Sequence, residues 1–165
     1  MIDKLTVNNY HLPRWEELPD IDLYMDQVLT ILNKYVAIFS EDNSKPITST
    51  MINNYVKQKV VKPPRNKKYD RVHLSYLLPV CILKQIMSIS EICSGIEVVL
   101  KNHKIPESYD IFCQMLETGL KNAFENKPPF DFSNEETTEL SIIQSAVASF
   151  VNLQYAKYLI SEVKK

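Results

Sequence analysis

Apolar residues recur at intervals of three and four along most of the chain, which is the spacing of amphipathic α-helices. The pattern predicts helices over residues 20–39, 49–58, 71–87, 88–103, 106–126 and 133–165. Start signals support these bounds. Asp70 can cap the third helix, Pro106 can open the fifth, and Ser88 and Ser133 each begin a capping box. The pattern therefore predicts an all-α protein.

The short helix over residues 49–58 has two distinct faces. Its inward stripe is formed by Met51, Ile52, Tyr55 and Val56. Thr48 is the natural N-cap, because its hydroxyl can accept a hydrogen bond from a free backbone N–H two or three residues later. Asn53, Asn54 and Lys57 must then point mainly to solvent.

Residues 60–69 interrupt the helical pattern. Val60-Val61 and Lys68-Tyr69 have strand-like composition, and the residues between them include Pro63-Pro64 and Asn66. Two prolines prevent a helix, and asparagine is suited to a turn. We expect a small β-hairpin, or wing, of two short strands.

These elements suggest three parts. Residues 1–19 form an N-terminal arm whose Trp15 packs on the body. Residues 20–92 form a winged helix-turn-helix domain, in which the helix over 71–87 is apolar on most sides and therefore central, with Pro79 kinking or splitting it. Residues 93–165 form a helical C-terminal extension.

Charge is distributed unevenly along the chain. The net charge is −1, but residues 45–71 hold eight basic residues against the single acid Asp70, which makes +7. The remaining residues carry 11 basic and 19 acidic side chains, which makes −8. Such asymmetry suits a face directed at a polyanion, and a solvated basic loop explains it equally well.

Composition and motifs argue against an enzyme. The chain has only two glycines, too few for the Gly-rich phosphate loops of nucleotide-binding folds. It lacks metal-ligand spacing, a Walker loop and a nucleophile elbow. Cys81, Cys93 and Cys113 lie in apolar contexts that favour buried, reduced thiols. We expect no catalytic residues, no metal and no cofactor.

The order helix, turn, short helix, hairpin and helix is instead that of a helix-turn-helix with a wing. The major groove of DNA admits one α-helix, and the asparagine amide matches the edge of adenine that the groove exposes. Free N–H groups at a helix N-terminus suit a phosphate. The candidate DNA-binding residues are Ser49, Thr50, Asn53, Asn54 and Lys57 on the recognition helix, and Lys59, Lys62, Arg65, Lys67, Lys68, Tyr69 and Arg71 on the wing and its flanks.

Two family resemblances follow from particular residues. In residues 47–92, Thr48, Tyr55, the proline-containing wing, Tyr69 and the step Ser88 to Ile92 resemble the winged-helix domain of MerR-type regulators. That resemblance implies DNA-binding transcriptional regulation. The segments 12–19, 23–27 and 51–57 are similar to a bacterial family known as domain of unknown function 1836, over roughly residues 10–150, for which no activity is implied.

The sequence thus favours a cytoplasmic, sequence-specific regulator that binds double-stranded DNA. The broad apolar surface of the last helix favours a homodimer, although this helix can instead pack within its own chain. An effector of unknown chemistry is compatible with the fold, and no membrane span is expected, because the longest apolar run has eight residues. Two alternatives remain. One is a protein-interaction module built on a winged helix, and the other is an enzyme or small-ligand sensor with a pocket among the C-terminal helices.

Overall fold

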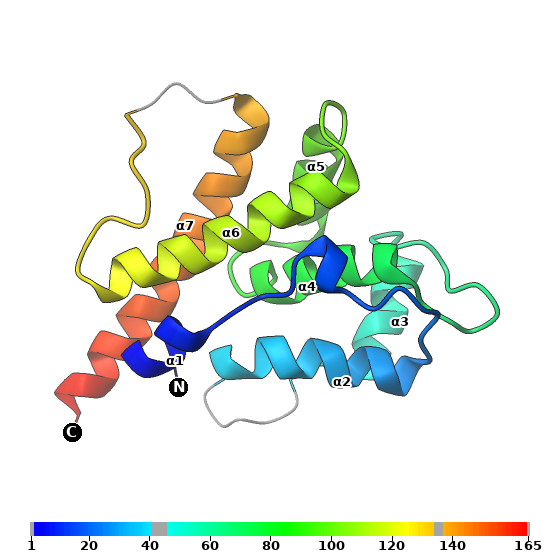
Figure 1. Ribbon diagram of the computed structural model, residues 1–165, viewed down its shortest axis with the longest axis horizontal. Helices are drawn as coiled ribbons and strands as arrows, with labels where there is room; N and C mark the ends of the chain where they lie inside the picture. The colour runs from blue at the N-terminus through cyan, green and yellow to red at the C-terminus, as the bar shows by residue number, and fades with distance from the viewer. Residues whose placement is uncertain (1, 41–45, 134–136, 165) are drawn as a thin grey trace.

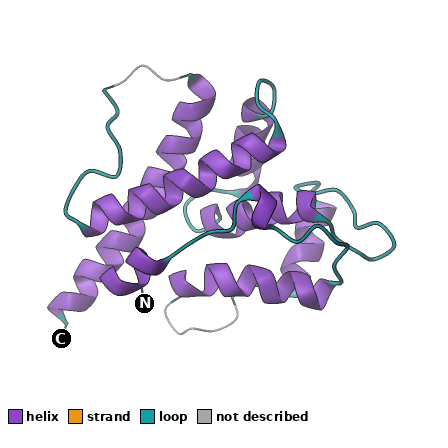
Figure 2. Cartoon of the chain, in the orientation of Figure 1, coloured by secondary structure: helices purple, strands orange, loops and turns teal. Residues whose placement is uncertain are grey.

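The computed structural model describes residues 2–40, 46–133 and 137–164. The described residues form seven α-helices and two short 3₁₀ helices, and no strand (Figure 2). Their bounds are α1 Lys4–Asn9, η1 Trp15–Glu17, α2 Met25–Val36, η2 Ala37–Phe39, α3 Ser49–Lys57, α4 Arg71–Leu83, α5 Ile89–Val99, α6 Ile105–Phe124 and α7 Thr138–Val163. The predicted all-α class is confirmed.

Helix α4 is the central element, as its composition predicts. Leu74, Leu77, Leu78, Cys81 and Ile82 are all fully buried, and α4 packs against α2, α5, α6 and α7. Asp70 caps it, because its Oδ1 accepts from the His73 N–H at 3.1 Å. Pro79 lies inside this one continuous helix. Of the two predicted effects of Pro79, a kink or a split, the split does not occur, and the helix ends one turn earlier than expected.

Two of the three C-terminal helices begin where the local signals in the sequence predict. Ser88 and Glu91 form the predicted capping box of α5, and Pro106 lies in the first turn of α6. The expected capping box at Ser133 is wrong for α7. Ser133 bonds to Asp131, and Thr137 is the N-cap, whose Oγ1 accepts from the Leu140 N–H at 3.4 Å. Residues 134–136, the rest of that predicted box, lie outside the described residues.

The N-terminal arm is held to α6 by a partly buried ion pair. Arg14 donates to both carboxylate oxygens of Glu117, at 2.8 and 2.9 Å, and the Leu12 N–H donates to the same carboxylate at 2.8 Å. Burial alone would raise the pKa of the Glu117 carboxyl, but these donors outweigh it and hold the pKa below its ordinary value. Trp15 is half-buried against the core, as predicted.

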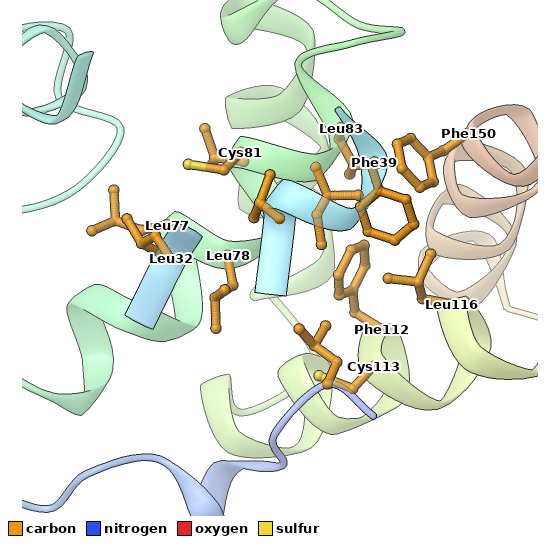
Figure 3. Packing of buried hydrophobic residues seen from close by; sticks show 14 of the residues in the cluster. Leu32, Phe39, Leu77, Leu78, Cys81, Leu83, Phe112, Cys113, Leu116 and Phe150 are labelled. Carbon is orange, nitrogen blue, oxygen red and sulfur yellow. The ribbon is translucent and has the colours of Figure 1, made fainter. Parts of the chain in front are cut away.

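One continuous core joins the arm, the middle and the C-terminal helices. Figure 3 shows Phe39 from η2 beside Phe112 of α6 and Phe150 of α7. The rings of Phe39 and Phe150 pack edge to face, with 4.9 Å between their centroids. Within the described residues, no helix is both long and apolar enough to cross a membrane. Figure 1 shows α1 and the end of α7 at one end of the molecule, and α3 with the loop that follows it at the other.

Candidate nucleic-acid interface

Helix α3 has the two faces that its sequence predicts. Thr48 is its N-cap, with Oγ1 accepting from the Met51 N–H at 3.4 Å. Ile52 and Tyr55 are buried, and burial raises the pKa of the Tyr55 hydroxyl to about 12. The outward positions form the exposed face of α3, which consists of Ser49, Thr50, Asn53, Asn54 and Lys57.

A buried asparagine fixes the chain that enters α3. Asn33 of α2 donates its side-chain N–H to the Ile47 carbonyl at 3.0 Å, and its Oδ1 accepts from the Ile47 N–H at 3.1 Å. Asn33 thus satisfies both backbone groups of a buried residue and sets the orientation of α3 against α2. Sequence reasoning missed it, because a single polar position in an apolar stripe carries no signal of its partner.

Helix α3 ends in a left-handed turn without glycine. The Val60 N–H donates to the Tyr55 carbonyl at 2.9 Å, and the Lys59 N–H to the Val56 carbonyl at 3.0 Å, which is the Schellman pattern. Lys59 takes the left-handed position, with φ of 59°. Since lysine is disfavoured there, the turn presents a cation at a position where glycine would relieve backbone strain.

The segment 59–69, named here the basic loop, is not a β-hairpin. Val60 and Val61 are buried anchors rather than strand residues. The only pairing within the loop is an isolated bridge between Arg65 and Lys68, closed by two backbone hydrogen bonds of 3.0 and 2.9 Å. The predicted two-stranded wing is therefore wrong. The reason is that Val60 and Val61 pack into the core rather than pairing across the loop.

The tip of the basic loop is a tight turn. Asn66 and Lys67 both have positive φ, 50° and 62°, as in the two-residue turns that favour Asn-Gly. The predicted turn at Asn66 is confirmed. Lys59, Lys62, Arg65 and Lys67 are exposed, and none of them forms an ion pair with another described residue.

The two other predicted residues of the wing, Lys68 and Tyr69, are not exposed. Tyr69 is buried, its backbone is bridged to Leu23 by two hydrogen bonds of 2.8 Å, and burial raises the pKa of its hydroxyl. Lys68 is half-buried, with Nζ 5.0 Å from the centre of the Tyr24 ring. The Tyr69–Leu23 bridge also explains why α2 begins at Met25 rather than near residue 20.

Arg71 is directed toward the N-terminal arm. Its side chain is 15% exposed and lies 3.5 Å from Glu16 and 3.6 Å from Asp20, with the guanidinium over the Trp15 ring. His73 is buried and belongs to the capping box of α4. These side chains hold the arm and α4 in place, and we leave them, with Tyr69, out of the interface.

Cys81 and Cys113 are buried, as predicted, whereas Cys93 is only partly buried. Burial raises the pKa of the Cys81 and Cys113 thiols to about 12, which leaves little thiolate at neutral pH. No group of three or more His, Cys, Asp or Glu residues in the described part of the chain could hold a metal ion.

A protein-family model matches residues 13–112, from the arm into the first half of α6, and its description is Domain of unknown function (DUF1836). The chain belongs to the DUF1836 family. The match covers more than half the chain and is shorter than the resemblance noted over residues 10–150. It contains α2, α3, the basic loop, α4 and α5, and it lends no support to the MerR resemblance. No curated protein and no solved structure matches the chain.

Proposed function

We propose that this DUF1836 protein is a non-enzymatic, sequence-specific regulator that binds double-stranded DNA through α3 and the basic loop. One observation carries the proposal. The exposed face of α3 bears two asparagines, and the adjoining loop holds four exposed cations that no described acid neutralises. An unpaired cation retains its full attraction for a phosphate, whereas a paired one must first break its ion pair.

The dimensions of α3 suit the major groove. An α-helix with its side chains is about 10–12 Å in diameter, and the groove is about 12 Å wide. In this arrangement Asn53 and Asn54 face base edges, where an amide pairs with adenine N6 and N7. Ser49 and Thr50 lie in the first turn, where free N–H groups and the helix dipole suit a phosphate.

The basic loop then takes the part of a wing without any strands. Lys57 at the end of α3 and Lys59 at its left-handed turn lie close together in the chain, and Lys62, Arg65 and Lys67 extend along the loop. These positions suit phosphates that flank the bases contacted by α3. About six phosphate contacts imply that the logarithm of the binding constant falls with log salt with a slope of about −5.

The proposed oligomer is a homodimer formed through α7. Leu159, Ile160 and Val163 expose 46%, 57% and 88% of their surface near the C-terminal end of this helix. Their spacing of one, three and four residues places them on one stripe, which an antiparallel or parallel second copy can cover. Light scattering that gives about twice the 19.2 kDa chain mass at micromolar concentration supports the dimer, and a monomer mass contradicts it.

The test of specificity is selection of bound duplexes from a random pool, followed by binding assays on the enriched sequence. Asn53→Ala/Asn54→Ala is expected to relax base preference with little loss of affinity for random DNA. Lys62→Glu/Lys67→Glu is expected to weaken binding to all duplexes alike. Lys4→Glu/Lys121→Glu, the same charge change at exposed positions outside the interface, controls for net charge. Absence of enrichment with the wild-type protein contradicts the proposal.

The alternative of a protein-interaction module predicts another result. A partner protein held by the apolar stripe of α7 would bind with weak salt dependence, and Leu159→Asp would abolish binding. Under the DNA proposal, Leu159→Asp lowers affinity only through loss of the dimer. The isolated half-site contacts of α3 then remain.

A further inference from the structure

An apolar cavity lies among α4, α5, α6 and α7. Its volume is about 100 Å³, and its walls include Pro79 of α4, Ile92 and Ile96 of α5, Phe112 of α6, and Ile142 and Ile143 of α7. For comparison, an engineered apolar cavity of about 150 Å³ stays dry and takes up benzene. The space therefore suits one ring or a short branched alkyl group.

Among the described residues that line the cavity, one side chain, that of Glu91, is charged. Glu91 is exposed, and its carboxylate accepts hydrogen bonds from the Ser88 N–H at 2.8 Å and the Ser88 hydroxyl at 2.7 Å. The hydrogen bond from the Ser88 hydroxyl and that from the Ser88 N–H lower the pKa of Glu91, so it stays anionic at neutral pH. A charged group inside the cavity would lose its hydration. An anion would also be repelled by Glu91, and a cation would gain only the weak, solvent-screened attraction of this exposed carboxylate.

Gly95 gives independent evidence that the cavity is kept open. The chain has two glycines, and neither has a positive φ. Gly119 is explained by packing, because a Cβ there would lie 2.9 Å from the Phe130 ring. At Gly95 an added Cβ would make only an ordinary contact of 3.5 Å with Ile142.

Gly95 lies in the interior of α5, where glycine is the least favourable residue after proline. Neither backbone conformation nor crowding requires it there. What it does provide is empty space, because Gly95 is part of the cavity wall.

The cavity also adjoins the end of α3. Tyr76, Ile96 and Leu100 line the cavity and line a neighbouring cleft as well. That cleft is also lined by Lys59 and Val60, the residues of the left-handed turn that ends α3. A molecule in the cavity would therefore contact the same three side chains that line the cleft beside this turn.

We propose that the cavity is a binding site for a small, neutral, hydrophobic molecule. Binding there changes the surroundings of Lys59 and Val60 through the side chains of Tyr76, Ile96 and Leu100. The inference rests on the cavity and on Gly95, and it does not depend on DNA binding. Failure of either proposal leaves the other standing.

The test is a titration of the full chain with three probes of similar size, monitored by the chemical shifts of the backbone amides in NMR spectra. Benzyl alcohol is neutral, benzoate is anionic and benzylammonium is cationic. Benzyl alcohol is expected to shift the amides of the cavity walls, and those of Lys59 and Val60, along one saturable curve. Both ions are expected to bind at least about tenfold more weakly, because each must be desolvated.

Gly95→Leu should fill the cavity and weaken benzyl alcohol binding at least about tenfold. Ser94→Leu, which places a leucine at an exposed position of the same helix, should leave binding unchanged. If Gly95→Leu does not fold, Gly95→Ala provides the test, with a several-fold loss of affinity and a higher Tm. No saturable shift in the wild type, equal binding of the ions, or full affinity in the folded Gly95 variant overturns the site. Saturation without shifts at Lys59 and Val60 overturns the connection to α3.

Discussion

Lys67→Gly should make the protein more stable and a poorer DNA binder. Lys67 has a φ of 62°, a conformation that costs an L-residue about 1–2 kcal/mol and costs glycine almost nothing. Glycine has more conformational freedom in the unfolded chain, and this offsets about 0.5–1 kcal/mol of the gain in stability. The net gain is about 0.5–1 kcal/mol, or about 1–4 °C in Tm for a domain of this size. Thermal unfolding followed by circular dichroism measures it.

The same substitution removes one exposed cation of the basic loop. The salt slope of DNA binding should become less negative by about 0.9. Lys62→Gly is the matched control, because Lys62 lies in the same loop and is not among the described residues with positive φ. It should weaken DNA binding similarly while giving no gain in stability. Refutation would be a lower Tm for Lys67→Gly, or DNA binding unchanged by both substitutions.

Three further predictions concern the frame that holds the interface. Asn33→Leu should destabilise the fold by about 2–4 kcal/mol in urea unfolding, because two buried backbone groups lose their partners; a loss below 1 kcal/mol would contradict this role. Glu117→Ala should cost about 2 kcal/mol. The pKa of the Glu117 carboxyl is lowered in the folded state, so its stabilisation is present above its ordinary value of 4.5 and is lost as the pH falls below it; the variant should lose this acid dependence in urea titrations from pH 7 to 3. Gly119→Ala should lower Tm through overpacking, whereas Gly95→Ala should raise it. An equal change of Tm in both variants would show that the two glycines differ from alanine only in helix propensity.

Three helix caps and the two faces of α3 were predictable from sequence because their causes are local. Thr48, Asp70 and Ser88 each cap the expected helix, and the inward and outward positions of α3 follow from a period of 3.6 residues. A cap needs only a hydroxyl or carboxylate and the free N–H groups of the next turn. Such signals do not depend on the rest of the fold.

The errors in the basic loop and its flanks concern residues whose partners are distant in sequence. Val60 and Val61 resemble a strand, yet they anchor the loop in the core. Tyr69 pairs with Leu23 rather than across a hairpin, and Arg71 turns to the N-terminal arm. Strand propensity mainly reports a fit to a half-buried surface, so it cannot tell an anchored loop from a ladder. The role of Asn33 was missed for the same reason.

The scarcity of glycine has a structural counterpart. Lys59, Asn66, Lys67 and Asn126 have positive φ, whereas neither glycine does. Two of these four positions carry exposed lysines of the basic loop. Residues that strain the backbone where glycine would not are often retained at functional positions, in agreement with the proposed role of the loop.

The most direct test of DNA binding by the basic loop is the salt dependence of the binding constant for a selected duplex. The account predicts a log–log slope of about −5 for the wild type, and a slope about 2 less negative for Lys62→Gly/Lys67→Gly. A wild-type slope near zero, or a slope that the double substitution leaves unchanged, would contradict it.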